Sequence, residues 1–346
     1  MKKILVTGDK GYIGSALTEV LIDRGYYIEG LDTGYFEDCN FLKFKDKYKS
    51  LKFDIRNIES KHIEKYDVVI HLAGLSNDPL GELEKSITYE INRDASIRLA
   101  DLCKKNSVKK FIYFSTQSIY GISQTDDELE EDNSIKNPIT AYAISKWEAE
   151  QYITNLGDDK FHVNVLRPAT VFGVSNRLRS DIVFNNFMSN AYATNEIEIK
   201  SDGSPIRPII HVIDLCLAVL ALLNQNNKNN NNQSYNVGKR GGNYTVKEIA
   251  DAVKNHYSEA KIFYSGEHGK DSRTYKVSFN KIYNEFSNSY NPQWDLKKGA
   301  IELDNFFKKV SFKKDDLFGT KTNRLNKLKD LLNKNLIDTK LFWKKN

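Results

Sequence analysis

Three glycines that follow the first apolar run constrain most strongly what this chain of 346 residues can fold into. The run Ile4–Val6 is short, and Gly8, Gly11 and Gly14 come after it with the spacing GxxGxxG. Small residues between a strand and a helix let the backbone turn tightly and approach a diphosphate, which the N–H groups and positive dipole end of the helix attract. Glycines also serve tight helix–strand contacts, so the surrounding pattern has to decide between the two roles.

Short apolar segments alternate with longer amphipathic segments through the first half of the chain. The expected strands are Ile4–Val6, Tyr27–Leu31, Val68–Leu72, Phe111–Ser115 and Val163–Arg167. The expected helices include Ser15–Arg24 and Thr88–Lys105. Uniformly apolar strands are typical of a parallel sheet that is buried on both faces. The alternation therefore predicts an α/β fold with a Rossmann-type, doubly wound parallel sheet.

The pattern becomes irregular after Pro168, and the length of the chain suits either two packed domains or one α/β unit with a substrate-binding cap. A further helix over Val212–Leu223 and a strand at Tyr235–Gly238 are expected to return to the first domain, and Thr245–Tyr257 should form a capped helix. The asparagine-rich run 224–232 is expected to be a loop without chemistry. The predicted divisions are residues 1–170 and 212–238 for the nucleotide-binding domain, 171–211 and 239–312 for the substrate-binding domain, and 313–346 for a basic helical tail.

Positive charge is concentrated in this tail, so the chain gives little support to nucleic-acid binding. Residues 311–346 carry nine Lys and one Arg against four Asp, a charge of +6, and the total of +5 leaves −1 for the rest. We interpret the tail as a solvated basic helix. Its leucines, Leu325, Leu328, Leu331 and Leu332, have helical spacing and are expected to dock on the body.

Several other classes of protein are disfavoured by composition. No apolar stretch reaches 18 residues, so no membrane span is expected. Cys39, Cys103 and Cys216 are widely spaced and odd in number, which argues against a disulfide framework and favours a cytoplasmic location. The six histidines show no ligand spacing, so we expect no metal.

An acidic residue ends the second predicted strand at the place where a nucleotide ribose needs one. Asp32 lies 18 residues after Gly14, and a carboxylate there accepts from both ribose hydroxyls and repels a 2′-phosphate. This favours NAD over NADP, although Asp32 could instead cap its own turn. Asp54 could accept from the adenine amino group or serve a turn. The small residues of Leu72–Gly74 would let the backbone pass close to the cofactor.

Tyr142 and Lys146 lie four residues apart at the start of a predicted helix, so both side chains share one face. A tyrosine with a pKa of about 10 is a poor base at neutral pH. A nearby ammonium and a positive nicotinamide ring would favour the phenolate, which could take a hydroxyl proton as hydride leaves the same carbon. Y-x-x-x-K by itself usually marks a helix surface. Upstream, the segment Ser115–Gly121 offers a hydroxyl to the reacting oxygen.

Together these motifs resemble the extended short-chain dehydrogenase/reductases of the NAD-dependent epimerase/dehydratase family. The shared features, in the family's order, are the GxxGxxG turn, Asp32, His71-Leu72-Ala73, the segment Ser115–Gly121, Tyr142-x-x-x-Lys146 and Leu166–Ala169. The resemblance implies that Tyr142, Lys146 and Thr116 are catalytic. It implies NAD as cofactor, a UDP-, GDP-, CDP- or TDP-linked sugar as substrate, and a homodimer formed through helices near 84–105 and 142–156.

The resemblance also implies which residues surround the two ligands. Those expected to bind the cofactor are Gly8, Gly11, Tyr12, Ile13, Gly14, Asp32, Asp54, Ile55, Leu72, Ala73, Gly74, Asn92, Tyr142, Lys146 and Pro168. Those expected to bind the substrate are Ser76, Thr116, Gln117, Ser118, Arg177, Asn186, Arg207 and Arg273. Arginine suits phosphate oxygens, but Arg207 and Arg273 could instead form interface salt bridges, and Asn186 could be a cap.

The residues after Thr116 bear on the type of reaction. In the family that this chain resembles, the sugar-nucleotide 4,6-dehydratases carry acidic residues one or two places after the catalytic threonine. These residues act as acid and base in the loss of water. This chain has Gln117 and Ser118 there, which cannot easily do so. This departure argues against a dehydratase and leaves 4-epimerases, 4-dehydrogenases and 4-keto reductases, between which the residues do not decide. We favour a nucleotide-sugar 4-epimerase on its frequency in the family alone.

Other activities are kept as alternatives. A 4-dehydrogenase or 4-keto reductase needs the same hydride transfer, and Phe172–Asp181 and Leu341–Trp343 resemble segments of GDP-heptose 4-dehydrogenases. An oxidoreductase for a non-sugar alcohol would not need the predicted phosphate-binding arginines. A non-catalytic NAD-binding protein would usually lack the tyrosine or the lysine.

Overall fold

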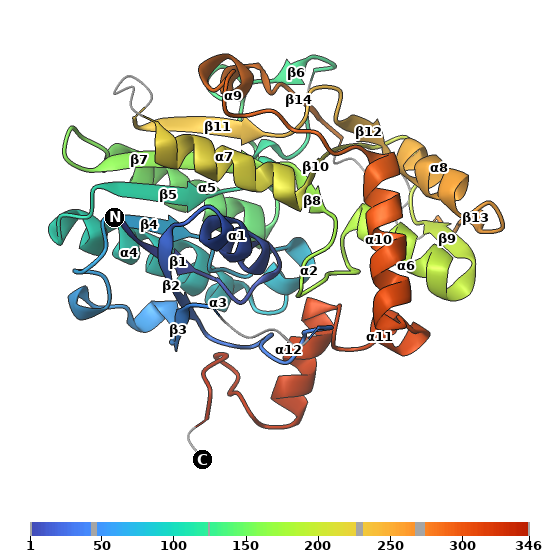
Figure 1. Ribbon diagram of the computed structural model, residues 1–346, viewed down its shortest axis with the longest axis horizontal. Helices are drawn as coiled ribbons and strands as arrows, with labels where there is room; N and C mark the ends of the chain where they lie inside the picture. The colour runs from blue at the N-terminus through green and yellow to red at the C-terminus, as the bar shows by residue number, and fades with distance from the viewer. Residues whose placement is uncertain (1, 43–46, 124, 226–230, 267–273, 345–346) are drawn as a thin grey trace.

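Seven parallel strands form the central sheet of the computed structural model, which describes residues 2–42, 47–123, 125–225, 231–266 and 274–344 (Figure 1). In spatial order the strands are β11 (Gln233–Val237), β7 (His162–Pro168), β5 (Lys110–Phe114), β4 (Val68–His71), β1 (Lys3–Thr7), β2 (Tyr27–Asp32) and β3 (Lys49–Lys52). The strand order changes direction between β1 and β4, where a doubly wound sheet opens a crevice for ligands. The predicted α/β fold is confirmed.

The central strands form where every residue of a short segment is apolar or can be buried. Strands β4 and β5 are buried along their entire length, as expected for the middle of a parallel sheet covered on both faces. The predicted segments in the first half correspond to β1, β2, β4, β5 and β7, and Tyr235–Gly238 overlaps β11. The pattern does not predict β3, because its sequence Lys49-Ser50-Leu51-Lys52 is mostly polar and lies at the exposed edge.

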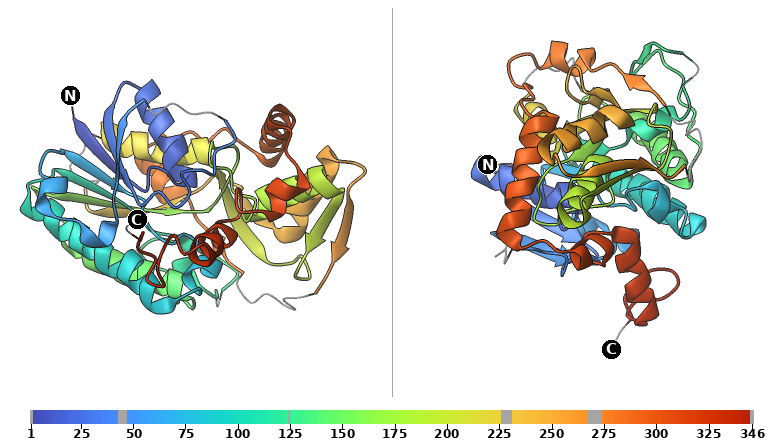
Figure 2. Two further views of the ribbon diagram at one scale, coloured as in Figure 1. Left: turned by 90° about the horizontal axis from the view of Figure 1, so that it is seen from below. Right: turned by 90° about the vertical axis from the view of Figure 1, so that its right-hand side faces the viewer.

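Helices cover both faces of the sheet (Figure 2). One face carries α1 (Tyr12–Asp23) and α7 (Val212–Asn224), and the other carries α2 (Asp78–Gly81), α3 (Lys85–Tyr89), α4 (Ala95–Lys105) and α5 (Ala141–Asn155). The helical stretch expected over Thr88–Lys105 is confirmed, and within it a π-helical turn (Glu90–Asp94) joins α3 to α4. Asn92 lies in that turn and points at the loop after β4.

A smaller α/β part follows β7 in the chain and packs around its own apolar cluster. Its strands are β8 (Thr170–Phe172), β10 (Ile206–His211) and β12 (Asn243–Thr245) in one sheet, and β9 (Glu196–Ile199) and β13 (Lys261–Tyr264) in another. Its helices are α6 (Val183–Thr194), α8 (Val246–His256), α10 (Leu296–Val310) and α11 (Lys314–Phe318). Beside it lie β6 (Glu128–Leu129), β14 (Lys276–Val277) and α9 (Asn280–Glu285). Thr245 and Glu248 form the predicted capping box of α8.

The C-terminal tail returns to the nucleotide-binding side of the molecule. Helix α12 (Arg324–Asn333) contacts α2 and lies to the right of β3 in Figure 1, and Leu328 and Leu331 are buried. The docking of the leucines is confirmed. The interpretation of the tail as a solvated basic helix is wrong for Arg324 and Lys327, which are buried, and the Lys327 ammonium pairs with Asp38 at 2.5 Å.

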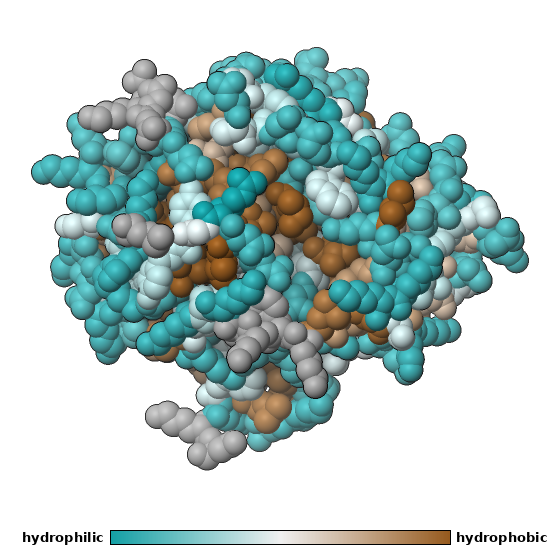
Figure 3. Space-filling view, in the orientation of Figure 1, coloured by the Kyte–Doolittle hydropathy of each residue, from teal (hydrophilic) through white to brown (hydrophobic). Residues whose placement is uncertain are grey.

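The face shown in Figure 3, which carries α1 and α7, is mainly hydrophilic, with apolar side chains visible in its middle. Within the described ranges, no helix has the length and apolar character needed to cross a bilayer. No three His, Cys, Asp or Glu side chains of that part of the chain gather as a metal site. Cys39, Cys103 and Cys216 are buried free thiols.

Candidate active site

A cavity of about 650 Å³ lies at the carboxyl ends of the central strands. The predicted site residues that line it are Gly8, Gly11, Tyr12, Ile13, Gly14, Asp32, Asp54, Ile55, Leu72, Ala73, Gly74, Ser76, Thr116, Gln117, Ser118, Tyr142, Lys146, Pro168 and Arg207. Arg273 lies outside the described residues. The glycine turn and the tyrosine–lysine pair, far apart in the sequence, thus share one cavity.

The glycine turn leaves no room for side chains. Gly8 has a φ of +76°, and a Cβ on it would lie 2.7 Å from the backbone nitrogen of Ala73. A Cβ on Gly14 would lie 2.1 Å from the carbonyl oxygen of Gly8. Gly11 is the N-cap of α1 and provides no side-chain cap, so the first N–H groups of the helix face the cavity. This geometry fits a dinucleotide diphosphate at the helix N-terminus.

Two carboxylates stand beside the turn at the adenosine end. Asp32 ends β2, and its oxygens accept from the backbone N–H groups of Lys10 (3.2 Å) and Gly34 (2.7 Å). Burial raises the pKa of Asp32, and these hydrogen bonds oppose the rise. Asp54 caps a short turn by accepting from the N–H of Arg56 (2.9 Å), whose guanidinium also binds its carboxylate. Both aspartates therefore combine the turn role that the sequence allowed with a place in the cavity wall.

Three residues that were predicted to bind a ligand do not line the cavity but lie behind its wall. The Asn92 amide holds Leu75, accepting from its N–H (2.8 Å) and donating to its carbonyl (3.0 Å). Nε of Arg177 donates to the carbonyl of Phe36 (3.3 Å). Nδ2 of Asn186 donates to the carbonyl of Ser180 (2.8 Å). The sequence could not show that these three side chains bind backbone groups, because only the folded chain brings those groups near them.

Tyr142 lies in the first turn of α5 and hydrogen-bonds Thr116, which follows β5. The Thr116 hydroxyl also accepts from the N–H of Ser118 (3.1 Å). Burial raises the pKa of Tyr142 to about 12, the hydrogen bond with Thr116 and the charge of Arg179 lower it, and Asp78 raises it. The lowered pKa expected from the sequence is therefore not found in the protein by itself, because desolvation outweighs the nearby positive charge.

Lys146 lies one turn further along α5, with its ammonium 4.1 Å from the centre of the Tyr113 ring. Burial lowers the pKa of Lys146 to about 7, and Glu150 opposes the change. His71 is buried next to this group, between the hydroxyls of Thr7 (2.6 Å) and Ser96 (2.8 Å). Burial and the charge of Lys146 keep the pKa of His71 well below its usual value, so it is a neutral packed side chain.

Gln117 and Ser118 both line the cavity beside Thr116. Nε2 of Gln117 donates to the carbonyl of Arg167 (3.1 Å), while its Oε1 is buried and has no partner among the described residues. The carboxylate that acts on Tyr142 is Asp78, which accepts from the hydroxyl of Thr140 (2.6 Å).

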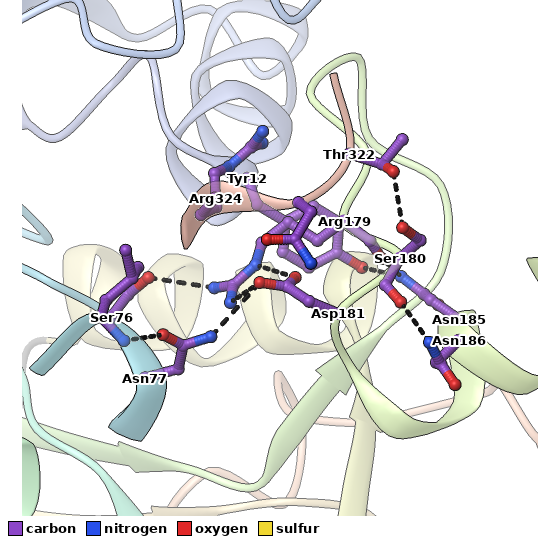
Figure 4. Close-up of polar contacts among 12 residues, drawn as sticks. Tyr12, Ser76, Asn77, Arg179, Ser180, Asp181, Asn185, Asn186, Thr322 and Arg324 are labelled. Atoms are coloured by element: carbon purple, nitrogen blue, oxygen red, sulfur yellow. Dashed lines mark hydrogen bonds and ion pairs between the residues drawn. The ribbon is translucent and has the colours of Figure 1, made fainter. Parts of the chain in front are cut away.

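A buried ion pair that the sequence analysis missed also lines the cavity (Figure 4). The Arg179 guanidinium donates to both oxygens of Asp181 (2.8 and 3.0 Å) and to the hydroxyl of Ser76 (3.0 Å). Asn77 donates to the same aspartate (3.3 Å). Arg207 and Tyr275 line the cavity from the smaller part. Two signals in the sequence pointed to this group: the charged pair in Arg179-Ser180-Asp181, and the resemblance of Phe172–Asp181 to a segment of GDP-heptose 4-dehydrogenases.

The chain was compared with known proteins. The model of the NAD dependent epimerase/dehydratase family matches residues 4–238. UDP-glucuronate 4-epimerase from Thermodesulfobacterium geofontis is 30% identical over 63% of this chain and 71% of its own length. Human dTDP-D-glucose 4,6-dehydratase is 27% identical over 75% of this chain and 77% of its own length. The crystal structure of UDP-glucuronic acid 4-epimerase from Bacillus cereus, in complex with UDP-glucuronic acid and NAD, has a TM-score of 0.76 and 24% identity, covering 89% of this chain and 99% of that one.

Proposed function

Since the chain belongs to the NAD-dependent epimerase/dehydratase family, we propose that it is a nucleotide-sugar 4-epimerase. NAD is the cofactor of the family, and the glycine turn and Asp32 of this chain fit it. The observation that carries the proposal is the meeting of three groups in one cavity. The hydrogen-bonded pair Tyr142 and Thr116 lies in the same space as Lys146 and the N-terminus of α1.

The side chains have distinct tasks in this proposal. Bound NAD would accept and return a hydride at C4 of the sugar. The Tyr142 hydroxyl group exchanges a proton with the sugar 4-hydroxyl, and Thr116 orients that hydroxyl. Lys146 binds the nicotinamide ribose and supplies positive charge beside the tyrosine. Arg179 and the hydrogen bond from Thr116 favour the phenolate, which burial disfavours.

Neither of the two residues after Thr116 is acidic, which supports epimerisation over dehydration. Loss of water from a 4-keto sugar needs a base and an acid near C5 and C6. The neighbouring side chains are Gln117 and Ser118, of which Gln117 offers an acceptor but no acid. We further propose that Ser76 and Ser118 bind the sugar and that Arg207 binds the substrate diphosphate.

The test is incubation with a panel of UDP-, GDP-, CDP- and TDP-linked sugars, with NMR of the products and nicotinamide absorbance. We expect inversion at C4 of one sugar without net NADH. Stoichiometric NADH would favour a 4-dehydrogenase, and loss of water a dehydratase, and either result would overturn the proposal. Tyr142→Phe should lower kcat by about 10²- to 10⁴-fold. Tyr152→Phe, on the exposed face of the same helix, is the matched control.

A further inference from the structure

The C-terminal tail supplies part of the wall of the cofactor cavity. Asn323, Arg324 and Leu325, at the start of α12, line the same cavity as the glycine turn. Arg324 is 2% exposed, so its guanidinium is removed from water although it lies near the end of the chain. Figure 4 shows Arg324 on the C-terminal segment, near the group that contains Arg179 and Asp181, and both of these residues act on it electrostatically.

Arg324 is a buried cation without an acidic partner in the part of the chain that the structure describes. Its Nη2 donates to the carbonyl of Arg177 (2.7 Å) and its Nη1 to that of Lys321 (3.3 Å), and the guanidinium lies 4.7 Å from the Phe36 ring centre. The nearby carboxylate of Asp181 is occupied by Arg179. A buried, unpaired charge is costly in a protein interior, so this arrangement favours binding of an anion.

The position of Arg324 indicates which anion this is. Phe36, on which it stacks, lies in the loop after Asp32 and lines the cavity. Arg177, whose carbonyl it holds, acts electrostatically on Asp32. Arg324 thus lies on the side of the cavity that holds the predicted ribose carboxylate, where a dinucleotide places its diphosphate beside the N-terminus of α1. Arg207, in contrast, lines the cavity from the smaller part.

The end of the tail is bonded to both loops at the adenosine end. Nε1 of Trp343 donates to the carbonyl of Thr33 (2.7 Å), and the Tyr35 hydroxyl donates to the carbonyl of Leu341. In the other loop, Nη1 of Arg56 donates to the carbonyl of Lys340 (2.7 Å) while its Nη2 binds Asp54 (2.7 Å). The same guanidinium lies 3.6 Å from the centre of the Phe342 ring. The tail therefore connects the loops after β2 and β3.

We propose that the segment 321–344 is a built-in part of the dinucleotide site. In this arrangement Arg324 binds the cofactor diphosphate directly, and residues 340–343 position the two loops that receive the adenosine. The inference rests on NAD binding and not on the reaction at the sugar, so it stands or falls separately from the epimerase proposal.

The decisive experiment is calorimetric titration of the full-length protein with NAD, ADP, adenosine and UDP. Arg324→Gln should weaken the binding of NAD and ADP by about 10- to 100-fold, as expected when a charge-assisted hydrogen bond is lost. The affinity for adenosine should change by about twofold or less. Lys329→Gln removes the same charge from an exposed position of the same helix and should change none of the affinities. A loss of equal size for adenosine, a loss confined to UDP, or no loss would each overturn the role of Arg324.

Two further variants keep the proposal testable if Arg324→Gln does not fold. Arg324→Lys keeps the charge but not the planar fork, so the ratio of ADP to adenosine affinity should fall; an unchanged ratio would contradict a direct diphosphate contact. Trp343→Phe removes the hydrogen bond to Thr33 and should weaken adenosine and ADP by the same factor. Unchanged adenosine affinity in that variant would contradict the positioning role of the tail.

Discussion

Nη2 of Arg167 lies 2.6 Å from Oε1 of Glu150, and the two side chains are only 4% and 2% exposed. Arg167 belongs to β7, whereas Glu150 belongs to α5, the helix that carries Tyr142 and Lys146. Nε of Arg167 reaches the same carboxylate oxygen at 2.9 Å, and its Nη1 donates to the carbonyl of Glu131 (3.0 Å). The pair therefore fixes the helix of the proposed catalytic residues to the sheet.

Breaking this pair should destabilise the protein. Arg167→Met leaves the Glu150 carboxylate buried and unpaired, and we expect the free energy of unfolding to fall by about 3–5 kcal/mol. Denaturant unfolding measures the change. The double variant Arg167→Met, Glu150→Leu removes both charges and should lose much less. A double variant as unstable as the sum of the two single variants would contradict this account.

Replacing Lys146 should remove activity but stabilise the protein. Burial lowers the pKa of Lys146 to about 7, whereas an unfolded chain keeps the ordinary value of 10.5. Between about pH 7 and 10.5 the unfolded state therefore binds more protons than the folded state. The contribution of Lys146 to stability rises as the pH increases through this range. At about 1.4 kcal/mol per pKa unit, its upper bound is about 5 kcal/mol.

Lys146→Met should therefore be more stable than the unmodified protein at pH 7, and the difference should shrink towards higher pH. Denaturant unfolding at several pH values measures it. Lys329→Met, on the exposed side of α12, is the control and should leave stability nearly unchanged. If the Lys146 variant is less stable at neutral pH and the difference does not vary with pH, the burial cost assigned to this lysine is wrong.

Asp78 should tune the ionisation of Tyr142. Burial raises the pKa of Tyr142 to about 12, and the Asp78 carboxylate adds to the rise. Asp78→Asn keeps an acceptor for the Thr140 hydroxyl but removes the charge, so the pKa of Tyr142 should fall and the rise of kcat with pH should move to lower pH. Ultraviolet titration of tyrosinate, with Tyr142→Phe as the reference, checks the assignment. A profile that stays in place or moves to higher pH would contradict it.

Asp9, inside the glycine turn, should make stability fall between about pH 4 and 6. Burial, and then the charge of Asp32, raise the pKa of Asp9 from 3.8 to about 6. The folded state binds the extra proton in this window, so stability decreases as pH rises through it, by about 3 kcal/mol at 1.36 kcal/mol per unit. Asp9→Asn should lack this decrease, because an amide does not titrate in this range. Its oxygen can still accept from Ser50 and Tyr48, so the local structure should be kept. Parallel unfolding curves for the two proteins over this range would contradict the raised pKa.

Part of the site could be predicted because its signals are local. Gly8 and Gly14 are required by the path of the backbone between a strand and the helix that follows it, and this path depends on neighbours in the sequence. Asp32 follows from its position at the end of an apolar strand. The spacing of Tyr142 and Lys146 follows from the period of a helix.

Other properties required the folded chain. The sequence assigned ligand contacts to Asn92, Arg177 and Asn186, but the fold turns their side chains towards nearby backbone carbonyl and N–H groups. The sequence predicts a lowered pKa of Tyr142 when Lys146 and a bound nicotinamide ring act together. In the protein by itself burial raises this pKa, and only the folded chain decides how strongly the ring is desolvated.

The sequence by itself thus predicted the alternation of strands and helices in the first half of the chain, together with the glycine turn and the tyrosine–lysine pair that line one cavity. The tertiary structure decided that Arg324 enters the cavity and that Trp343 bonds Thr33, 310 residues earlier. The physical reason is how far apart in the sequence the interacting residues lie. Turns and helical spacing are set within a few residues, whereas burial and contacts between distant segments arise only when the whole chain packs.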